Sequence, residues 1–587
     1  MIALTVGLAV VVIATFTVVA MRAGGGSCGG SGLKLNVVSS PEKYGLMQKF
    51  ARDYSGREVG GQCVEVVLQN KSSGEAMSAL ARGWNDQADG GPRPDVWSPA
   101  GSGWVNLLRY RLERSGDPDM VPDETPGIAV APLVIAMPRP MAQALGWPRK
   151  QLGWDDVLKI AKDPKGWGDY GHPEWGKFRL GKTNPNFSTS GLNATVGAYF
   201  AATHKSDDLA SSDLDSTEVQ SYVRGVEGSV VHYGDTTLTF LQGLQRADDA
   251  GEGMSYVSAV AVEEMSVWYY NQGNPTGDPA LAGKHAKPKT PLVAIYPKEG
   301  TLVSDHPFVT LRTAGAAKRR AAADFLKYLR GSDVQQRFQQ NAFRTYDNQP
   351  GDLTKQSNGL LPDQPAKMLA PPAPRVLNKV LTSWEQLRKR ANVLLVVDVS
   401  GSMKTNVPKA GKTRLQLVQA SLTQALGEFI DLDSVGLWEF STRLDGIKAY
   451  HELMPMGPLG ASVSGGTRRE ALQSKINNLR TRGYTGLYSS TLAAYDQVKA
   501  NEQDGAINSV VLLTDGGNDN DPNGISQSEL MSKLDRESGV RIFTIAFGAE
   551  ADKEVLKKIS EATDAAWYNS SDPTALTQVL PAVTSNF

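Results

Sequence analysis

Apolar and polar positions follow two periods along this chain, and together they predict alternating strands and helices. Leu33–Val38 and Cys63–Leu68 are short apolar runs typical of strands, and Glu42–Tyr54 between them has the spacing of an amphipathic helix. Ser73–Arg82 is predicted as a second helix, and Asp95–Ser98 as the end of a third strand. This strand–helix–strand–helix–strand order implies a parallel sheet with right-handed crossovers.

The alternation continues through the first half of the chain. Gly127–Arg139 is a longer apolar run predicted as a strand, and Gln151–Ala161 is predicted as a helix. Leu292–Tyr296 is predicted as a strand that breaks into a turn. Ala316–Arg330 has a strong amphipathic pattern and is followed by a second helical segment, Asp333–Gln340. Residues 33–346 are therefore predicted as one α/β region.

Residues 347–390 are predicted as a linker and a lead-in helix. The linker is rich in Pro, Gln, Asn and Asp without clear periodicity, and Val376–Arg390 has helical spacing. From 391 to 587 the pattern predicts a doubly wound α/β domain whose first strand, Val393–Val399, is apolar throughout, as in a sheet covered on both faces. The other predicted strands are Ser434–Phe440, Ser509–Thr514 and Val540–Phe547, and the predicted helices are Arg414–Ile430, Thr467–Leu479, Ser489–Ala500, Ser526–Glu537, Lys553–Ala562 and Thr574–Val583.

Composition agrees with several globular domains and excludes one class of partner. A chain of 587 residues is too long for a single hydrophobic core. It has 61 Lys plus Arg and 62 Asp plus Glu, so no net field draws it to nucleic acid. We expect no nucleic-acid partner.

The N-terminus departs from this composition. Ile2–Met21 carries no charge and is long enough, as a helix, to cross the roughly 30 Å hydrocarbon layer of a bilayer. Residues 1–22 are predicted as a transmembrane signal anchor or a cleaved signal peptide, and 23–32 as a Gly-rich tether. A third interpretation is a lipoprotein attached at Cys28. All three export the remaining chain, and we expect it at the cell surface, anchored to the membrane.

Only two cysteines occur, Cys28 and Cys63. Outside the cytoplasm such a pair is more often bonded than free. If Leu33–Val38 and Cys63–Leu68 are adjacent parallel strands, both sulfurs lie at the same edge of the sheet, where a bridge is geometrically possible. We predict a Cys28–Cys63 disulfide; two unrelated buried thiols are the alternative.

The region 33–346 resembles the type II extracellular solute-binding proteins, which have the periplasmic-binding-protein fold. The residues that carry the resemblance are Val37-Val38-Ser39-Ser40, Pro185-Asn186-Phe187-Ser188-Thr189-Ser190-Gly191, Ala294-Ile295-Tyr296-Pro297-Lys298-Glu299-Gly300-Thr301 and Ala323-Asp324-Phe325-Leu326-Lys327-Tyr328-Leu329. The resemblance implies two α/β lobes with a ligand between them. Its crossing strands are expected near 127–139 and 292–296.

Hydroxyl groups are the candidate ligand contacts of that cleft. Ser188–Ser190 precede a helix, whose free N–H groups form a natural anion site. The candidates for holding a small anion or carboxylate are Ser39, Ser40, Ser98, Ser188, Thr189, Ser190 and Ser258. Ordinary helix capping by Ser188 explains the same residues, and a cleft used for protein contact is a third possibility. By family order, His232, Tyr233 and Asp235 would lie across the cleft.

The most informative motif is Asp398-Val399-Ser400-Gly401-Ser402, at the end of the first strand of the last domain. Ligand sites in open α/β sheets lie at this edge. Thr485 lies on a glycine-flanked loop before a helix, and Asp515 ends another strand. Their five side chains supply hard oxygen donors, which favour Mg²⁺, Mn²⁺ or Ca²⁺ over zinc.

This set resembles the metal-ion-dependent adhesion site of von Willebrand factor A (VWA) domains, and every position is filled. The resemblance implies that Ser400, Ser402 and Thr485 bind Mg²⁺ directly. It implies that Asp398 and Asp515 hold the ion through waters or switch to direct contact. A carboxylate of a protein partner would fill the last position. A site that has lost its ion and a hydrolytic Mg²⁺ site are the alternatives. Asp519, Asn520 and Asp521 form either a solvated turn or a further ion site.

Catalytic motifs are absent from the sequence. It contains no His-Glu-x-x-His, no Gly-x-Ser-x-Gly and no phosphate-binding Gly-x-x-x-x-Gly-Lys-Ser/Thr loop. We therefore expect a binding protein and not an enzyme. The main hypothesis is an adhesion or scaffold protein; the alternative is a solute receptor for transport or sensing. An accessory subunit of a chelatase is the third hypothesis, and export of the chain argues against it.

Overall fold

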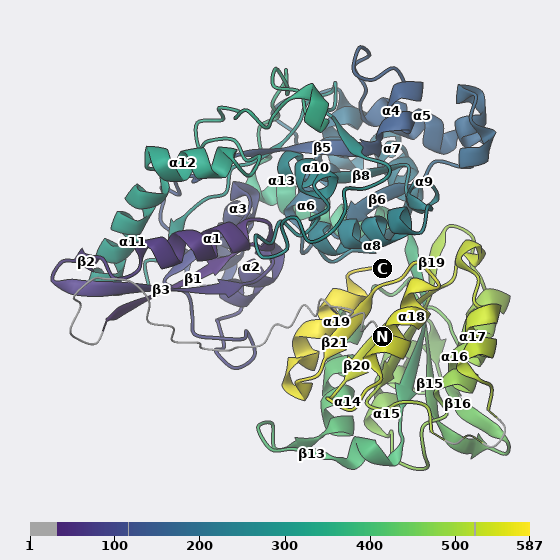
Figure 1. Cartoon of the computed structure of the whole chain (residues 1–587). Helices are drawn as coiled ribbons and strands as arrows, with labels where there is room; N and C mark the ends of the chain where they lie inside the picture. Colours follow the sequence, from purple (N-terminus) through teal and green to yellow (C-terminus); the bar gives the residue numbers. More distant parts are fainter. Residues whose placement is uncertain (1–31, 116, 520, 522–523) are drawn as a thin grey trace, which may run out of the picture.

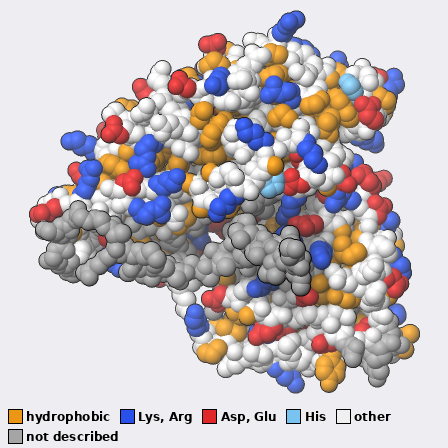
Figure 2. All heavy atoms as spheres, viewed as in Figure 1, with side chains coloured by type: hydrophobic (Ala, Val, Ile, Leu, Met, Phe, Trp, Pro, Cys, Tyr) orange, Lys and Arg blue, Asp and Glu red, His pale blue; other side chains and the backbone are white. Residues whose placement is uncertain are grey.

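The computed structural model describes residues 32–115, 117–519, 521 and 524–587, which form two lobes and a third domain (Figure 1). Helices and strands alternate in all three, so the α/β class is confirmed. Basic and acidic side chains are interspersed on the face drawn in Figure 2. Within the described residues no helix is long and apolar enough to cross a membrane. Residues 2–21 and Cys28 lie outside them, so the predicted anchor and disulfide stay predictions.

The first lobe is built on a sheet of order β11-β4-β1-β3-β2. β1 pairs in parallel with both β3 and β4, as the strand–helix alternation predicts. The parallel pairing brings the start of β1 close to Cys63, whose carbonyl lies beside Gly32. The elements are β1 Leu33–Ser39, β2 Glu58–Val59, β3 Gln62–Asn70, β4 Val96–Ser98, β11 Val309–Thr310, α1 Pro41–Tyr54, α2 Ser73–Ala81, α3 Ser102–Ser115, α11 Ala316–Leu329 and α12 Ser332–Gln339.

The second lobe has a sheet of order β10-β5-β8-β6-β7, with β9 also paired to β5. Its elements are β5 Ala131–Pro138, β6 Leu180–Thr183, β7 Val230–Gly234, β8 Ala259–Glu263, β9 Leu292–Ile295, β10 Val303–Ser304, α4 Arg139–Ala144, α5 Trp154–Lys162, α6 Thr189–Thr203, α7 Thr217–Gly228, α8 Thr237–Asp249, α9 Gly253–Tyr256 and α10 Glu264–Asn271. The expected return crossing near 292–296 lies elsewhere, because β9 belongs to this sheet. The chain returns from β10, which pairs with β5, to β11, which pairs with β4 of the first lobe.

The predicted linker is packed against the lobes. Leu360 and Leu369 are buried, and Leu369 donates a backbone hydrogen bond to Thr301. The lead-in helix is confirmed as α13 (Pro374–Leu387). It contacts α3 of the first lobe and α6 and α7 of the second, so it spans both lobes.

The third domain has the predicted doubly wound sheet, of order β16-β15-β12-β19-β20-β21. All neighbours are parallel except the antiparallel edge strand β16. The sequence pattern predicted neither β16 nor β21, the strand at the other edge. Its main elements are β12 Arg390–Asp398, β15 Ser434–Asp445, β16 Lys448–Met454, β19 Ala506–Thr514, β20 Arg541–Phe547, β21 Trp567–Ser570, α14 Arg414–Ala425, α15 Arg468–Asn477, α16 Leu487–Ala500, α17 Gln527–Lys533, α18 Lys553–Glu561 and α19 Leu576–Thr584. Two short hairpins, β13 Asn406–Val407 with β14 Lys412–Thr413 and β17 Ser462–Val463 with β18 Gly466–Thr467, complete the set.

The third domain docks on the second lobe. The backbone N–H of Tyr233, on the edge strand β7, donates to the carbonyl of Asn586 at 3.1 Å. One hydrophobic cluster runs from the second lobe through Trp384 into the third domain, where Phe543 and Phe587 belong to it. The two bodies therefore share part of their core.

Candidate metal centre

The predicted metal ligands meet at one edge of the third domain's sheet. β12 lies between β15 and β19 and is parallel to both, so the carboxyl ends of the three strands share this edge. Asp398 is the last residue of β12, and Asp515 directly follows β19. Thr485 lies in the loop before α16. Parallel pairing thus gathers segments that are far apart in sequence.

The side-chain oxygens at this edge lie within contact distance of one another. The Ser400 and Ser402 hydroxyls are 2.9 Å apart, and the Ser402 hydroxyl donates to Asp515 Oδ1 at 2.6 Å. Asp398 Oδ1 accepts from the backbone N–H of Ser400 at 2.7 Å. The Thr485 hydroxyl would lie 3.4 Å from a Cβ placed on Gly516, the residue after Asp515. The structure therefore brings all five predicted residues together.

Asp398 is fully buried at the floor of the site. Burial raises the pKa of its carboxyl to about 6, and the nearby Asp515 carboxylate acts in the same direction. Hydrogen bonds from Ser400 and Thr514 oppose this shift. A buried carboxylate with a second carboxylate beside it favours a cation in the same place.

Three side chains that sequence reasoning did not predict support the site. Thr514 donates to Asp398 Oδ2 at 2.5 Å, and Arg414 donates to Asp515 Oδ2 at 2.8 Å. Arg414 also pairs with Glu550. The position of Thr514 next to Asp515 could have indicated its role. The sequence pattern gives no such indication for Arg414 and Glu550, because they come from the start of α14 and from the loop after β20.

Asp519 anchors the loop that carries Thr485. Its carboxylate accepts the backbone N–H of Thr485 at 3.0 Å, and its own N–H donates to the Thr485 carbonyl at 2.8 Å. Asp521 accepts from the Ser489 hydroxyl at 3.2 Å. Both carboxylates thus have partners within the protein.

The residues fit a hard divalent cation. In an octahedral Mg²⁺ shell with ligands at about 2.1 Å, neighbouring oxygens lie about 3.0 Å apart. The 2.9 Å spacing of the two serine hydroxyls matches that separation. Among the described residues, no group of three or more His, Cys, Asp or Glu is placed to hold a metal. Hydroxyls supply most of the donors here, and they favour Mg²⁺, Mn²⁺ or Ca²⁺.

The hydroxyls predicted for the cleft between the lobes are bonded within the protein. Ser188, Ser190 and Thr237 form a chain with spacings of 3.0 and 2.7 Å. Ser40 accepts from Lys43, and Ser98 donates to the Pro307 carbonyl at 3.0 Å. All seven candidates are buried: Ser39, Ser40, Ser98, Ser188, Thr189, Ser190 and Ser258.

The two lobes touch across this cleft. The backbone N–H of Gly74, in the first lobe, donates to the Phe187 carbonyl of the second at 3.1 Å. The indole N–H of Trp104 donates to the Thr189 hydroxyl at 2.9 Å. A cavity lined by Trp104 and Thr189 measures about 10 Å³, which holds one water at most.

Two family models match the chain. The model of bacterial extracellular solute-binding proteins matches residues 35–344, which is more than half of the chain. The chain belongs to this family. The model of the von Willebrand factor type A domain matches residues 392–582, so the third domain is a VWA domain. VWA domains commonly bind a divalent cation at the edge described above.

Individual relatives match parts of the chain. The uncharacterized protein YfbK of Escherichia coli K12 is 29% identical over 163 residues, which are 27% of this chain and 24% of YfbK. The sulfate-binding protein SubI of Mycobacterium tuberculosis is 15% identical and covers 60% of this chain and 96% of its own, with a TM-score of 0.36. A VWA protein from Catenulispora acidiphila is 17% identical over 34% of this chain and 42% of its own, with a TM-score of 0.26.

Four residues that the sequence placed at the cleft of the solute-binding domain contact other parts of the protein. His232 and Tyr233 lie on β7, where the His232 ring approaches Phe543 of the VWA domain and the backbone N–H of Tyr233 donates to the Asn586 carbonyl. The Tyr233 hydroxyl donates to Glu227 inside the second lobe. Ser258 accepts from the Trp167 indole and the Arg179 N–H inside the second lobe. Asp235 is buried close enough to Glu75 of the first lobe for that charge to act on it. Of the four, only Asp235 remains near the lobe boundary.

Lys43 is a buried charged residue beside the cleft hydroxyls Ser40 and Ser98, and it was not identified from the sequence. It is completely buried, and its ammonium donates to the Ser40 hydroxyl and to the carbonyls of Ser98 and Pro99 at 2.7, 2.9 and 3.0 Å. Burial lowers the pKa of this ammonium to about 8, although Glu42, Glu263 and Asp305 oppose the shift. A lysine in an amphipathic helix gives no sequence signal of such burial.

Proposed function

We propose that the VWA domain binds a divalent cation, with Mg²⁺ preferred, and that the cation captures an acidic side chain of a protein partner. The convergence of Asp398, Ser400, Ser402, Thr485 and Asp515 on one sheet edge supports this proposal most directly. Hydroxyl ligands are neutral, so they leave the ion electrophilic toward an outside carboxylate.

The exposure of the site gives the partner access. Asp398, Ser400, Thr485 and Asp515 are buried, whereas Ser402 is exposed at the surface. A cation held by these residues would therefore have protein on one side and solvent on the other. An acidic side chain of another protein could approach from the solvent side.

We further propose that the protein is a binding protein, without catalytic activity, anchored at the cell surface by its N-terminal segment. Membership of an extracellular solute-binding family supports export of the chain. The uncharged segment Ile2–Met21 supports the membrane anchor. In this arrangement the protein would act as an adhesion or scaffold protein.

Binding of Mn²⁺ to the full chain, measured by electron paramagnetic resonance, tests the metal step. We expect one Mn²⁺ per chain, displaced by Mg²⁺, and loss of binding in Asp398→Ala. The matched control is Asp496→Ala, which removes an exposed carboxylate of α16 and should bind Mn²⁺ normally. Equal binding by both variants would refute the site. Capture of Asp- or Glu-containing peptides, with and without Mg²⁺, then tests the partner step.

A solute receptor is the second candidate, and Glu263 favours it. This carboxylate is buried, Glu42 and Lys43 of the first lobe are close enough for their charges to act on it, and the Ser304 hydroxyl is its one neighbouring donor among the described residues. Burial and then the Glu42 charge raise the pKa of Glu263 well above its usual range. These groups favour a cation or a hydrogen-bond donor over the small anion suggested by the serines. A rise in melting temperature of the full chain with putrescine, but not with sulfate, would support this receptor.

A further inference from the structure

A cavity of about 440 Å³ lies where the VWA domain meets the second lobe. Its lobe wall is formed by β7, α8 and Tyr256, and its VWA wall by α18, the segment 564–566 and Asn586. Pockets of roughly 300–1,000 Å³ hold small organic ligands. The cavity is separate from both the metal site and the cleft between the lobes.

Small side chains on both walls create the space. Gly243 and Ala247 lie one turn apart on α8, Ala250 directly follows that helix, and Ala565 and Ala566 belong to the VWA wall. A Cβ on Gly243 would lie 2.5 Å from the Tyr256 hydroxyl, so a larger residue there would invade the cavity wall. Ala250 is exposed, and it marks the end at which the cavity reaches solvent.

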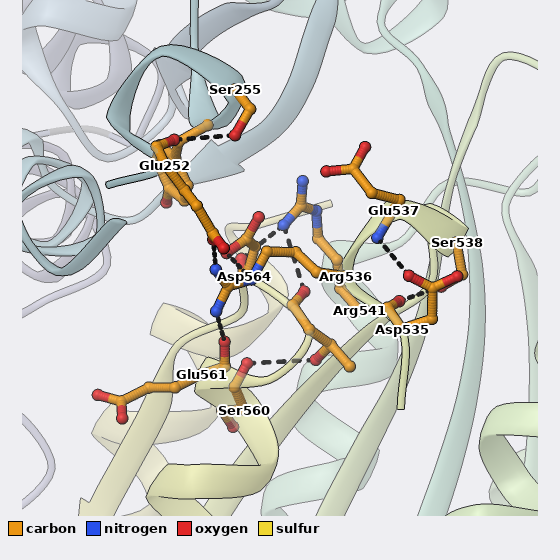
Figure 3. A network of polar contacts seen from close by, with 12 residues as sticks. Glu252, Ser255, Asp535, Arg536, Glu537, Ser538, Arg541, Ser560, Glu561 and Asp564 are labelled. Atoms are coloured by element: carbon orange, nitrogen blue, oxygen red, sulfur yellow. Dashed lines mark hydrogen bonds and ion pairs between the residues drawn. The ribbon is translucent and has the colours of Figure 1, made fainter. Parts of the chain in front are cut away.

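Five of the six Lys, Arg, Asp and Glu residues that line the cavity are in ion pairs, and two of these pairs join the two domains; Figure 3 shows the pairs of Arg536. Arg536 of the VWA domain pairs with Glu252 of the lobe and, at 3.0 Å, with Asp564. Arg246 of the lobe pairs with Glu561 of the VWA domain at 3.3 Å. These pairs leave little charge unmatched in the lining.

Lys557 is the exception among the charged lining residues. Asp249, the remaining acid of the lining, contacts His285 at 3.1 Å. No ion pair joins Lys557, on α18, to any acidic group within the described residues. Among the described lining residues, Lys557 therefore offers the one ammonium group that has no ion-pair partner.

The rest of the lining suits an apolar, aromatic body. Phe240 and His232 stack with ring centres 5.1 Å apart, and Tyr256 meets Phe240 edge-on at 5.7 Å. Burial lowers the pKa of His232 to about 3, and Arg541 acts in the same direction, so the imidazole is neutral and adds no charge. Aromatic rings prefer such stacked and edge-on neighbours.

We propose that this cavity binds a small organic monoanion with an aromatic body. The anionic group pairs with Lys557, and the body fills the space between the alanine- and glycine-lined walls. Because the ligand would contact both domains, it would bind only when they are docked and would stabilise that arrangement by mass action.

The probe that matches this chemistry is 8-anilinonaphthalene-1-sulfonate, an aromatic monoanion whose fluorescence rises in apolar surroundings. Titration of the full chain should show one saturable site. Ala566→Trp and Ala250→Trp, which fill the cavity from opposite walls, should both remove that site. Dye bound elsewhere contributes equally to all variants, because they share the rest of the chain, so it does not affect the comparison between them. Circular dichroism checks that each variant is folded.

The charge requirement has its own matched pair. Lys557→Glu should weaken dye binding at least about tenfold, since an attraction becomes a repulsion. Lys558→Glu changes an exposed neighbour outside the lining and should leave binding unchanged. The proposal would be overturned if both tryptophan variants kept the saturable site. It would also be overturned if Lys557→Glu and Lys558→Glu changed dye binding equally.

Discussion

The metal edge of the VWA domain and the cleft between the lobes use the same kinds of residue in different ways. Both place Ser, Thr and Asp after the carboxyl ends of parallel strands or at helix starts. In the cleft, Ser188 and Ser190 bond each other and Thr189 bonds Trp104 of the other lobe. At the metal edge, Ser402 is exposed, and its hydroxyl bonds Ser400 and Asp515, two other proposed ligands of the ion.

This difference shows that hydroxyl position alone does not define a ligand site. A buried hydroxyl that already has a protein partner contributes to stability, and a ligand must break that bond before using it. A cluster of hydroxyls beside two carboxylates gains a better partner when a cation arrives. The VWA edge therefore suits a ligand directly, whereas the cleft suits contact between the lobes.

The largest expected effect comes from forcing the lobes apart. A Cβ on Gly74 would lie 2.0 Å from the Asn186 carbonyl oxygen, so Gly74→Ala should displace the 186–188 loop. We expect a loss of about 3 kcal/mol in the free energy of unfolding, as for other overpacked sites, measured by urea denaturation. Mn²⁺ binding should not change.

Gly228→Ala is the matched control for this substitution. Nothing lies within 4 Å of a Cβ at Gly228, at the end of α7, so the change should be neutral or stabilise by about 0.5 kcal/mol. If Gly74→Ala were equally harmless, the lobes would not touch in solution, and the cleft would again be open to a solute.

Lys43 gives a pH-dependent test of the closed cleft. Its folded pKa of about 8 lies below the ordinary value of 10.5, so between these pH values the unfolded chain binds more protons. Stability must then rise with pH across this window, by about 3 kcal/mol for a shift of this size. We expect the difference in unfolding free energy between the wild type and Lys43→Met to grow by that amount from pH 8 to 10.5. A flat difference would show that water reaches Lys43.

Local patterns predicted most elements of the first lobe and of the VWA domain, but not the strands β6, β7 and β8 of the second lobe. The apolar run Val393–Val399 and the helix Ser73–Arg82 are decided by side chains within one element, and both form close to the predicted bounds. β16 was not predicted, because Lys448–Met454 alternates only partly and depends on pairing with β15. The prediction of a crossing near 292–296 was wrong for a similar reason, because a short apolar strand does not reveal which sheet it joins.

The two candidate sites differ in how far sequence could predict them. The spacing of Asp398, Ser400 and Ser402 is a property of one loop, so the pattern predicted their meeting. Several partners of the cleft hydroxyls are distant in sequence, such as Trp104 for Thr189 and Thr237 for Ser190, and no local pattern indicates them. The Arg414–Asp515 contact was unpredictable for the same reason.

Removing one hydroxyl from each region gives the smallest effects and the most direct test of the comparison. Ser402→Ala deletes an exposed ligand of the proposed site, so Mn²⁺ affinity should fall about tenfold or more while the free energy of unfolding changes by less than about 0.5 kcal/mol. Ser190→Ala deletes a buried hydroxyl that lies 2.7 to 3.1 Å from those of Thr183, Ser188 and Thr237. It should cost about 1–2 kcal/mol of stability and leave Mn²⁺ binding unchanged. Electron paramagnetic resonance and urea denaturation on both variants separate the two roles. If Ser190→Ala does not change the free energy of unfolding, or if Ser402→Ala binds Mn²⁺ as the wild type does, the distinction is refuted. The hydrogen bonds that a hydroxyl makes within the protein would then not tell the two regions apart.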